Sequence, residues 1–300
     1  MAKPQFTGVI TALATPFHDD GSLDLESYRK LIRAQLADGV SGLVPMGTTG
    51  ESVTLDDEEH AACVKACIEE CKGKVPVIAG AGTNDTKKAI AMHKRVAALG
   101  ADAALHVTPY YNKPTQEGLY RHFKAIAQSN PLPIVLYNVP GRTGVDMLPE
   151  TVARLAKDCP TIVAVKEATG SIARAQELVN KIQATGRDDF AILSGDDGLI
   201  LGLLAVGGHG VISVISHLCA KELSAMCKAF GDGKIAEAQA LARKTSPLAS
   251  ILFFRTSPLP VKTALAWRGA MKKTFRLPLC PLSDDEETQL RKMLTAEGWL

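Results

Sequence analysis

Short apolar runs recur along the chain at regular intervals, and each has the length and composition of a buried strand. Several of them are continuously apolar, as in parallel strands that are covered on both faces. The pattern predicts eight strands, the first within 6–17, the sixth ending at Lys166, and the others at 42–47, 75–80, 103–108, 133–138, 190–195 and 210–215.

Helical periodicity follows each predicted strand, over about 24–37, from 56 onward, and over 85–99, 116–128, 149–156, 172–184, 198–205 and 221–230. Eight successive strand–helix units indicate an α/β fold, a (β/α)8 TIM barrel that occupies residues 1–230. A doubly wound sheet is the alternative, but it usually has fewer strands and a glycine-rich nucleotide fingerprint. Residues 80–82 are only a fragment of that fingerprint, so we interpret them as a turn.

The remainder of the chain, residues 231–300, has helical patterns only, at about 234–252, 260–267 and 284–295. Such a segment cannot add strands to a barrel. We therefore predict a C-terminal helical region, which is a candidate surface for contact between subunits.

The amino-acid composition and charge argue against several classes of function. Hydrophobic residues make up 46% of the chain and charged residues 22%, as in a globular protein with a sizeable core. The formal net charge is +2 and no lysine–arginine cluster is present, which argues against a dedicated nucleic-acid-binding protein. The first six residues lack the apolar segment of a secretory signal, and no apolar run is long enough to span a membrane. These features predict a cytoplasmic protein with no membrane or nucleic-acid partner.

Three of the cysteines, Cys63, Cys67 and Cys71, fall on one face of a predicted helix. A zinc site would need a fourth ligand or nearby histidines, and no zinc-ligand spacing is present. Buried free cysteines behave as small apolar side chains. We predict that these thiols belong to the core and that no metal is bound.

Lys166 ends the predicted sixth strand, directly after the apolar residues 162–165. Burial disfavours the charged form of a lysine, and a neutral amine can attack a carbonyl to form a Schiff base. The competing interpretation is a lysine whose flexible side chain reaches solvent. For a single strand-end lysine considered alone, this second interpretation is the commoner outcome. Strand alternation turns the next residue, Glu167, away from Lys166, so we leave it out of the chemistry.

The active site of a (β/α)8 barrel lies at the carboxyl ends of its strands, where this chain gathers hydroxyl, phenol and guanidinium groups. Each has an ordinary alternative: a tight turn, a core tyrosine or a surface arginine. Together they would supply a nucleophilic amine, a proton shuttle and an anchor for an acidic substrate, from Lys166, Tyr137, Thr49, Tyr111 and Arg142.

Two further motifs are interpreted structurally. Asp196 and Asp197 are expected to cap the next helix. The glycine-rich segment 207–210 precedes the eighth strand, whereas a phosphate cradle would follow it, so we expect close backbone packing there.

These motifs, in this order and at this spacing, resemble the dihydrodipicolinate synthase family of pyruvate-dependent class I aldolases, to which N-acetylneuraminate lyase is related. The resemblance covers essentially the whole chain and rests on residues 47–52, 108–112, 137–143, 165–168, 193–197, 208–213 and 258–262.

The resemblance implies that Lys166 forms an imine with pyruvate, and that the derived enamine attacks the aldehyde of L-aspartate 4-semialdehyde, a reaction of lysine and diaminopimelate biosynthesis. It implies that Tyr137 is the acid/base. Thr49 and Tyr111 would complete the proton relay, with Tyr111 reaching in from a neighbouring subunit. The family's members assemble as homotetramers of two tight dimers, and no cofactor or metal is implied.

The resemblance also implies substrate contacts. The backbone N–H groups of Thr48 and Thr49 would hold the pyruvate carboxylate, and Arg142 would bind the semialdehyde carboxylate. Gly195 and Ile212 would contribute backbone carbonyls near the imine.

Two alternatives stay open. A sister aldolase, such as N-acetylneuraminate lyase or a keto-deoxy-sugar-acid aldolase, would share the lysine and the phenol. The Thr48–Thr49 pair and Arg142 favour the synthase, because a short carboxylate is suited to arginine and a sugar acid to hydroxyl partners. A non-enzymatic barrel that only binds a ligand would not need the complete set of groups.

Feedback-inhibited family members bind L-lysine at a dimer interface. The matching positions here are Ser52, Val53, Asp57, His60, Asn84, Lys88 and Tyr110. Strongly responsive members carry glutamate at the position of Lys88 and often histidine at that of Asp57. A cation at position 88 would repel the amine of the effector, so we expect weak or absent inhibition by lysine.

Overall fold

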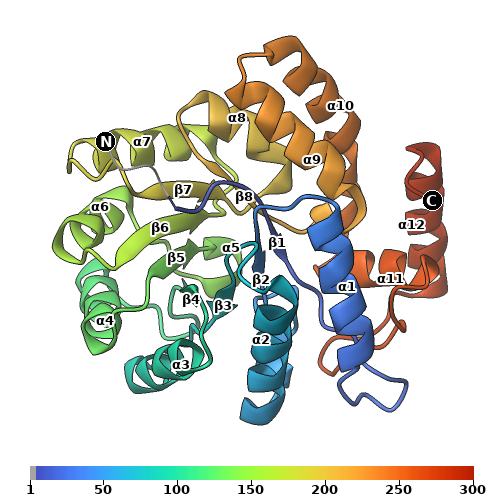
Figure 1. The fold of residues 1–300 in the computed structure, drawn as a ribbon, viewed down its shortest axis with the longest axis horizontal. Coiled ribbons are helices and arrows are strands. Elements are labelled where there is room, and N and C mark those ends of the chain that lie inside the picture. Colours follow the sequence, from blue (N-terminus) through green and yellow to red (C-terminus); the bar gives the residue numbers. More distant parts are fainter. Residues whose placement is uncertain (1–4) are drawn as a thin grey trace.

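The computed structural model describes residues 5–300 and shows eight parallel strands that curl into a barrel (Figure 1). Their order around the barrel is β2-β1-β8-β7-β6-β5-β4-β3. A parallel bridge between Leu43 and Val77 brings β2 to β3 and closes the circle. The strands are β1 Gly8–Ala12, β2 Gly42–Val44, β3 Ile78–Gly80, β4 Ala103–Val107, β5 Ile134–Asn138, β6 Ile162–Glu167, β7 Ala191–Ser194 and β8 Gly210–Ser213.

Helices alternate with the strands and surround them (Figure 1), which confirms the predicted (β/α)8 architecture. They are α1 Leu25–Ala37, α2 Asp57–Cys71, α3 Thr86–Ala98, α4 Gln116–Ser129, α6 Pro149–Asp158, α7 Ile172–Gln183, α8 Ile200–Ala205 and α9 Ser216–Gly231. Two short helices were not predicted: α5 Pro140–Thr143 and the 3-10 turn η1 Ser52–Thr54. The helix predicted over 198–205 consists of the 3-10 turn η2 Asp197–Leu199 followed by α8.

Helix starts coincide with residues that cap free N–H groups. The Asp24 side chain accepts from the N–H of Ser27 at the start of α1. Asp56 and Glu59 form a reciprocal capping box at the start of α2. This local chemistry explains why the starts of α1 and α2 were predicted to within one residue. The prediction was wrong for α9, which has no side-chain cap and begins at Ser216, five residues before the predicted start at 221.

Strands β2 and β3 are shorter than the sequence predicts. Pro45 ends β2 and Pro76 precedes β3, and neither has an N–H to donate to a sheet. Their carbonyls still take part, since Pro76 O accepts from Leu43 N at 3.0 Å and Pro45 O from Gly80 N at 3.0 Å.

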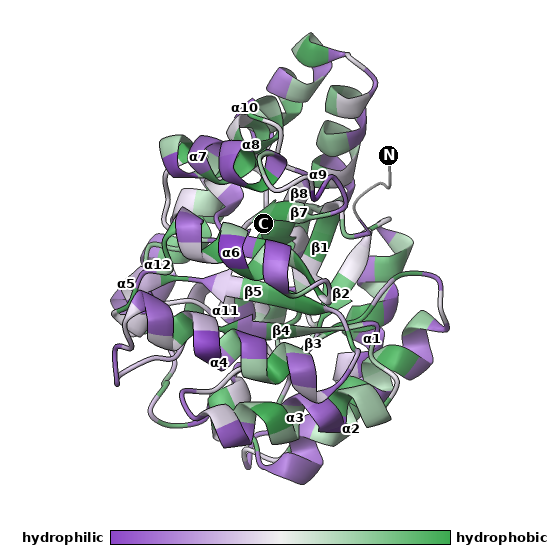
Figure 2. Cartoon of the chain, turned by 90° about the vertical axis from the view of Figure 1, so that its left-hand side faces the viewer, coloured by the Kyte–Doolittle hydropathy of each residue, from purple (hydrophilic) through white to green (hydrophobic). Residues whose placement is uncertain are grey.

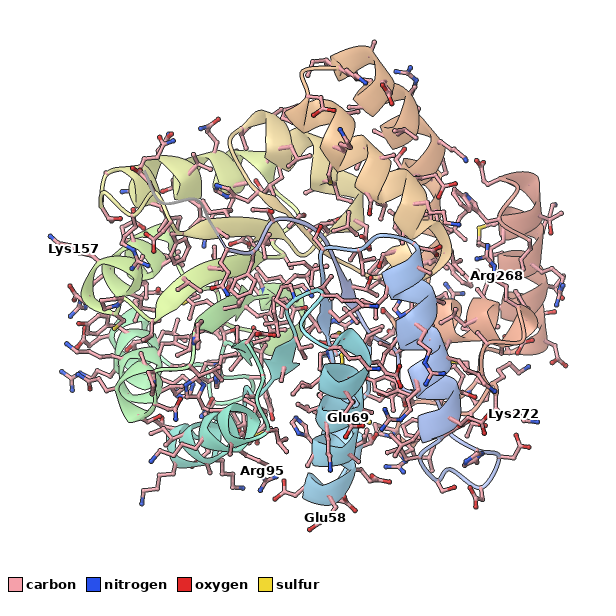
Figure 3. All side chains as sticks on the ribbon, in the orientation of Figure 1. Glu58, Glu69, Arg95, Lys157, Arg268 and Lys272 are labelled. Carbon is pink, nitrogen blue, oxygen red and sulfur yellow. The ribbon has the colours of Figure 1, made fainter. Side chains whose placement is uncertain are left out.

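Apolar side chains fill both the inside of the barrel and the layer between strands and helices. The inner cluster includes Ile10, Val44, Leu105, Val135 and Leu193. Figure 2 shows the strands as mainly hydrophobic, whereas the surrounding helices alternate between hydrophobic and hydrophilic residues. Charged side chains such as Glu58, Lys157 and Lys272 lie at the periphery (Figure 3). Coverage on both faces explains the continuously apolar runs of the sequence.

The glycine-rich segment before β8 is a site of close packing, as predicted. Gly210 has φ +155°, and a Cβ there would lie 2.1 Å from the Gly8 carbonyl oxygen. A Cβ on Gly208 would lie 2.4 Å from Leu203 Cγ. A side chain at either position would clash, so glycine lets β8 approach β1 at position 210 and lets the preceding segment approach α8 at position 208.

The prediction that the three cysteines of one helix face belong to the core is confirmed. Cys63, Cys67 and Cys71 are buried free thiols in the core cluster that contains α1 and α2. Burial raises the pKa of the Cys63 thiol to about 12. No group of three His, Cys, Asp or Glu side chains within residues 5–300 is arranged to hold a metal ion.

The C-terminal part is helical, with α10 Ile235–Leu252, α11 Leu259–Trp267 and α12 Asp284–Ala296. Helix α10 packs along α9 and contacts η2, while α11 and α12 lie on the side of α1 (Figure 1). The division of the chain at residue 230 stays a prediction. Within residues 5–300, no helix combines the length and apolarity needed to cross a membrane.

Candidate active site

Lys166 and Tyr137 form the centre of the candidate site. They face each other from β6 and β5, where their Cα atoms are register partners. The Lys166 Nζ atom lies 4.3 Å from the centroid of the Tyr137 ring. Both residues are buried, with exposed fractions of 6% and 7%. The lysine therefore ends inside the barrel mouth and does not extend into solvent.

Two lysines are buried, Lys166 and Lys262, and their surroundings differ. Lys262 is paired with a carboxylate of Glu51. No ion pair within residues 5–300 includes Lys166. The Lys166 amine is thus left beside the Tyr137 ring without a carboxylate partner, whereas the amine of Lys262 is paired.

Gly195 makes room for Lys166. A Cβ at position 195 would lie 2.6 Å from Ala168 Cβ and 3.1 Å from Lys166 Cε. Glycine thus lets the loop after β7 approach the lysine directly. Ile212 lies on β8, is buried, and belongs to the same inner cluster as Tyr137.

Asp197 departs from the prediction. Asp196 does cap η2, by accepting from Gly198 N at 3.0 Å. The Asp197 side chain instead crosses to the segment after β8, where it accepts from the N–H groups of Val214 at 2.9 Å and Ile215 at 3.1 Å. The prediction that both residues cap a helix was therefore wrong for Asp197, because the segment after β8 offers its carboxylate two N–H groups.

Asp197 is also electrostatically relevant to the site. Burial raises the pKa of its carboxyl group, and that shift is opposed by hydrogen bonds from Ser213, Val214 and Ile215 and, to a smaller extent, by attraction to Lys166. Its Oδ1 atom is buried and has no hydrogen-bond partner within residues 5–300. The Asp197 side chain thus joins the segment after β7 to the segment after β8. No sequence motif signals this role, because the partners are backbone groups.

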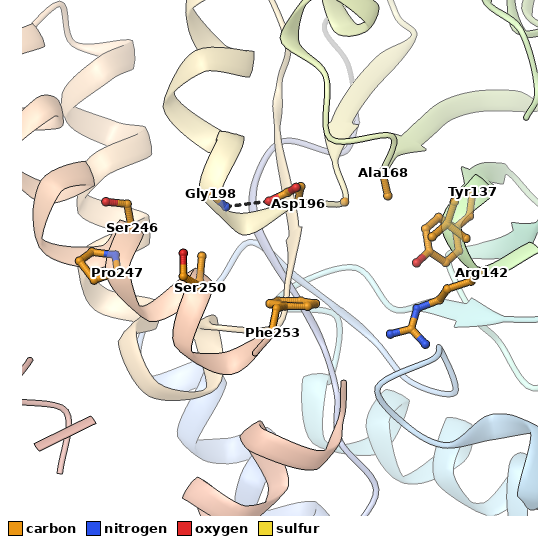
Figure 4. Close-up of a pocket in the computed structure, with 12 residues that line it drawn as sticks. Tyr137, Arg142, Ala168, Asp196, Gly198, Ser246, Pro247, Ser250 and Phe253 are labelled. Carbon is orange, nitrogen blue, oxygen red and sulfur yellow. Dashed lines mark hydrogen bonds between the residues drawn. The ribbon is translucent and has the colours of Figure 1, made fainter. Parts of the chain in front are cut away.

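A cavity of about 640 Å³ opens beside Tyr137. Tyr137 and Arg142 lie on one side. Ser246 and Ser250 of α10 and Phe253, directly after that helix, lie on the other (Figure 4). The α10 wall was not predicted, since a helix from beyond the barrel carries no local sign that it borders an active site.

Arg142 comes from the short helix α5, directly after β5. Its NH2 atom donates to the backbone carbonyl of Ser257 at 3.3 Å. Arg142 also lines the cavity, where its guanidinium can meet a carboxylate. Ser257, which sequence reasoning missed, also has a buried hydroxyl with no partner within residues 5–300.

The loop after β2 carries Thr48, which is exposed, and Thr49, which is buried. The N–H groups of Gly50 and Glu51 donate within the loop, to Gly47 O at 3.2 Å and Thr48 O at 3.1 Å. In contrast, no acceptor within residues 5–300 is found for the N–H groups of Thr48 and Thr49. Two adjacent free N–H groups are a natural receptor for a carboxylate.

The expected proton relay is not assembled within one chain. No hydrogen bond within residues 5–300 joins the hydroxyls of Thr49, Tyr137 and Tyr111. Tyr111 is 89% exposed and has the left-handed φ of +74°, so its ring projects from the barrel rim. The structure brings Tyr137 to Lys166 but leaves Tyr111 outside the site of its own chain.

Three of the seven side chains that match a lysine-binding site are engaged with other groups. Asp57 forms an ion pair with Arg95 at 2.5 Å. The His60 ring binds the Gly80 carbonyl at 2.8 Å, and burial lowers its pKa. Asn84 donates to the carbonyl of Tyr110 at 3.1 Å. Of the remaining positions, Val53 and Lys88 are exposed and Ser52 is half-buried.

Glu167 points away from the cavity, in agreement with strand alternation. It accepts from the N–H of Thr169 at 2.9 Å and from Asn138 at 3.3 Å. Burial raises the pKa of this carboxyl group, an effect that these hydrogen bonds oppose. Glu167 thus braces β6 against β5 from the outer face.

Comparison with known proteins identifies the family of this chain. The model of the dihydrodipicolinate synthetase family matches residues 5–297. A 4-hydroxy-tetrahydrodipicolinate synthase from Nitratidesulfovibrio vulgaris (strain DP4) is 50% identical over 296 residues, which cover 99% of this chain and 100% of that protein.

Solved structures agree with this result. The crystal structure of dihydrodipicolinate synthase from Thermotoga maritima is 46% identical, with a TM-score of 0.96 and coverage of 99% of this chain and 100% of that one. The synthase from Cyanidioschyzon merolae, crystallised with lysine bound, is 41% identical, with a TM-score of 0.94 and the same coverage. The chain belongs to the dihydrodipicolinate synthetase family.

Proposed function

We propose that this protein condenses pyruvate with L-aspartate 4-semialdehyde, the reaction of a 4-hydroxy-tetrahydrodipicolinate synthase, in lysine and diaminopimelate biosynthesis in the cytoplasm. Relatives of that name at about half identity over the whole chain support this activity. The observation that carries the proposal is the buried Lys166, which lies over the Tyr137 ring beside the cavity that Arg142 lines.

The covalent steps start at Lys166. Its amine attacks the keto carbon of pyruvate, and loss of water gives the imine. Removal of a methyl proton yields the enamine, whose carbon attacks the aldehyde of the second substrate. The substrate amine then displaces Lys166 and closes the ring, so that the lysine is released unchanged.

The carboxylates of the two substrates need separate anchors. The free N–H groups of Thr48 and Thr49 suit the pyruvate carboxylate, and the guanidinium of Arg142 suits that of the semialdehyde. Backbone carbonyls of Gly195 and Ile212 would face the imine.

Proton transfer is assigned to Tyr137, with Thr49 and Tyr111 as its relay. A ring that is 89% exposed in one chain supports the proposal that Tyr111 enters the site of a neighbouring subunit. The active form would then be at least a dimer, and we propose a homotetramer of two tight dimers.

Replacing Arg142 by alanine is expected to lower kcat/KM for the semialdehyde by about 10- to 100-fold, the loss expected when a charged hydrogen-bonding partner is removed. Imine formation with pyruvate should change far less, since it precedes entry of the semialdehyde. Steady-state kinetics and borohydride trapping measure the two steps separately.

The matched control is Arg121→Ala, which removes an exposed arginine on α4 that pairs with Glu117. It should leave both measurements unchanged. Equal loss of trapping and condensation in the Arg142 variant would discredit the anchor role.

The choice between the synthase and a sister aldolase is decided by substrate. The purified protein should consume pyruvate and L-aspartate 4-semialdehyde together, and should not cleave N-acetylneuraminate. Efficient cleavage of the sugar acid without condensation would overturn the proposed activity.

Inhibition by L-lysine is expected to be weak or absent. Asp57 is already paired with Arg95, and the exposed cation of Lys88 would repel the amine of the effector. A titration of condensation activity with lysine measures this, and half-inhibition below millimolar lysine would refute it. Lys88→Glu, which reverses the charge, should bind lysine more tightly than the wild type does.

A further inference from the structure

A buried ion pair joins the Thr48–Thr49 loop to the C-terminal helical region. Glu51 follows this loop by two residues, and its Oε1 atom accepts from Nζ of Lys262 in α11. Both side chains are 0% exposed. The residues are 211 positions apart in the chain. The pair is therefore a tertiary link between the barrel mouth and a helix beyond the barrel.

The surroundings satisfy both charges. Lys262 also donates to the Thr274 carbonyl at 2.8 Å, and its Nζ lies 4.5 Å from the Phe17 ring centroid and 4.7 Å from that of Phe275. The second oxygen of Glu51 accepts from Arg276 N at 3.2 Å. Burial lowers the pKa of Lys262, and attraction to Glu51 opposes that shift.

Stability alone is a poor reason for such a pair. Burial of two charges costs desolvation free energy, and well-packed apolar side chains at similar positions are often as stabilising or more so. What a charged pair provides is a defined geometry, because a short ionic contact fixes both partners in one arrangement.

The loop needs such a constraint. Met46 and Glu51, at its two ends, have φ of +59° and +53°, a conformation that non-glycine residues adopt only when the surroundings enforce it. Between them, Thr15 Oγ1 donates to the carbonyl of Gly50 at 2.7 Å. These contacts fix the loop through Gly50 and Glu51, while the N–H groups of Thr48 and Thr49 have no acceptor within residues 5–300.

We propose that Glu51 and Lys262 are positioning residues, which hold the Thr48–Thr49 loop in the conformation that receives the pyruvate carboxylate. The inference rests on the proposed function, in which this loop binds pyruvate. Through Lys262, the C-terminal helical region would then support substrate binding, in addition to any contact that it makes between subunits.

The test measures the pyruvate concentration at which borohydride trapping of the imine is half-maximal, in three variants of the full chain. Glu51→Gln keeps the shape and removes one charge, and Lys262→Met removes the other. The double variant Glu51→Leu with Lys262→Met removes both charges without leaving one unpaired. Each should need about ten- to a hundredfold more pyruvate, while trapping at saturating pyruvate stays complete.

The control is the exposed ion pair between Lys181 and Glu150, whose atoms are 2.7 Å apart. Lys181→Met should leave the pyruvate dependence unchanged. The double variant should unfold at the wild-type temperature, which separates positioning from stability. A folded double variant with wild-type pyruvate dependence would overturn the inference, and so would one in which only the maximal rate falls.

If Lys262→Met does not fold, the isosteric Glu51→Gln variant tests the inference by the same measurement of pyruvate dependence. Failure of the proposed function looks different, because the wild-type protein itself would then not be labelled by borohydride in the presence of pyruvate.

Discussion

Replacing Lys166 by alanine is expected to abolish both condensation and imine trapping, with kcat lowered by at least about 1,000-fold. The reason is that a covalent intermediate cannot form without the amine, and no lysine side chain lines the cavity beside Tyr137 that could replace Lys166. Borohydride reduction in the presence of pyruvate, followed by peptide mass mapping, should find the added mass on the wild-type peptide that contains Lys166 and nowhere in the variant.

The matched control is Lys157→Ala, which removes an exposed lysine of α6 at the edge of the molecule (Figure 3). This variant should be labelled and active like the wild type. A second comparison comes from Lys262, which is as deeply buried as Lys166 but paired with Glu51. Label on Lys262, or an active Lys166→Ala variant, would refute the proposed mechanism.

Lys166 also shows what the sequence can reveal about the site. An apolar run that ends in a lysine places that residue at the carboxyl end of a buried strand, and eight such units place all strand ends on one rim. Strand periodicity and helix capping are local, which is why the barrel and the positions of Tyr137, Arg142 and Gly195 could be predicted.

The groups that support the site could not be predicted, because their partners are distant in the sequence. Asp197 binds backbone N–H groups beyond β8, and Glu51 binds Lys262, 211 positions away. Ser250 and Phe253 reach the cavity only because α10 folds back over the barrel mouth. Which of these residues meet depends on the packing of whole elements, and no spacing rule encodes it.

Acidification from pH 7 to 4 is expected to destabilise the folded protein by several kcal/mol. Six histidines have a lowered pKa because they are buried as neutral rings: His60, His93, His106, His122, His209 and His217. Two of them, His122 and His217, have a folded-state pKa of about 4. Unfolding exposes each ring and returns its pKa to about 6.5.

His217 shows why protonation is unfavourable. Its Nδ1 atom binds the Val214 carbonyl at 2.8 Å, and its Nε2 atom accepts from the N–H of Ala14 at 3.1 Å. These contacts require the neutral tautomer with hydrogen on Nδ1. A second proton, on Nε2, would face the N–H of Ala14 and break the link between the ends of β1 and β8.

Proton binding determines whether the folded protein gains or loses stability as the pH falls. Below pH 6.5 the unfolded chain binds more protons at these histidines than the folded chain does, so stability falls as the pH falls. The contribution of the neutral rings is complete above pH 6.5 and is lost as the pH approaches 4. For His122 and His217 the loss is about 3 kcal/mol each, against a total stability of about 5–15 kcal/mol for a typical protein. Carboxylates with strong ion pairs act at lower pH, since the pKa of Glu70 is about 2.

Urea unfolding at several pH values between 4.5 and 7.5 measures this loss directly. His217→Gln and His122→Gln should each flatten the dependence of the unfolding free energy on pH, because each removes one proton that is taken up on unfolding. The control is His18→Gln, since the side chain of His18 is 55% exposed, and its pH dependence should match that of the wild type. An unfolding free energy that is the same at pH 4.5 and 7.5 would contradict the assignment of these rings as neutral, whereas equal slopes in all three variants would place the proton uptake on other groups.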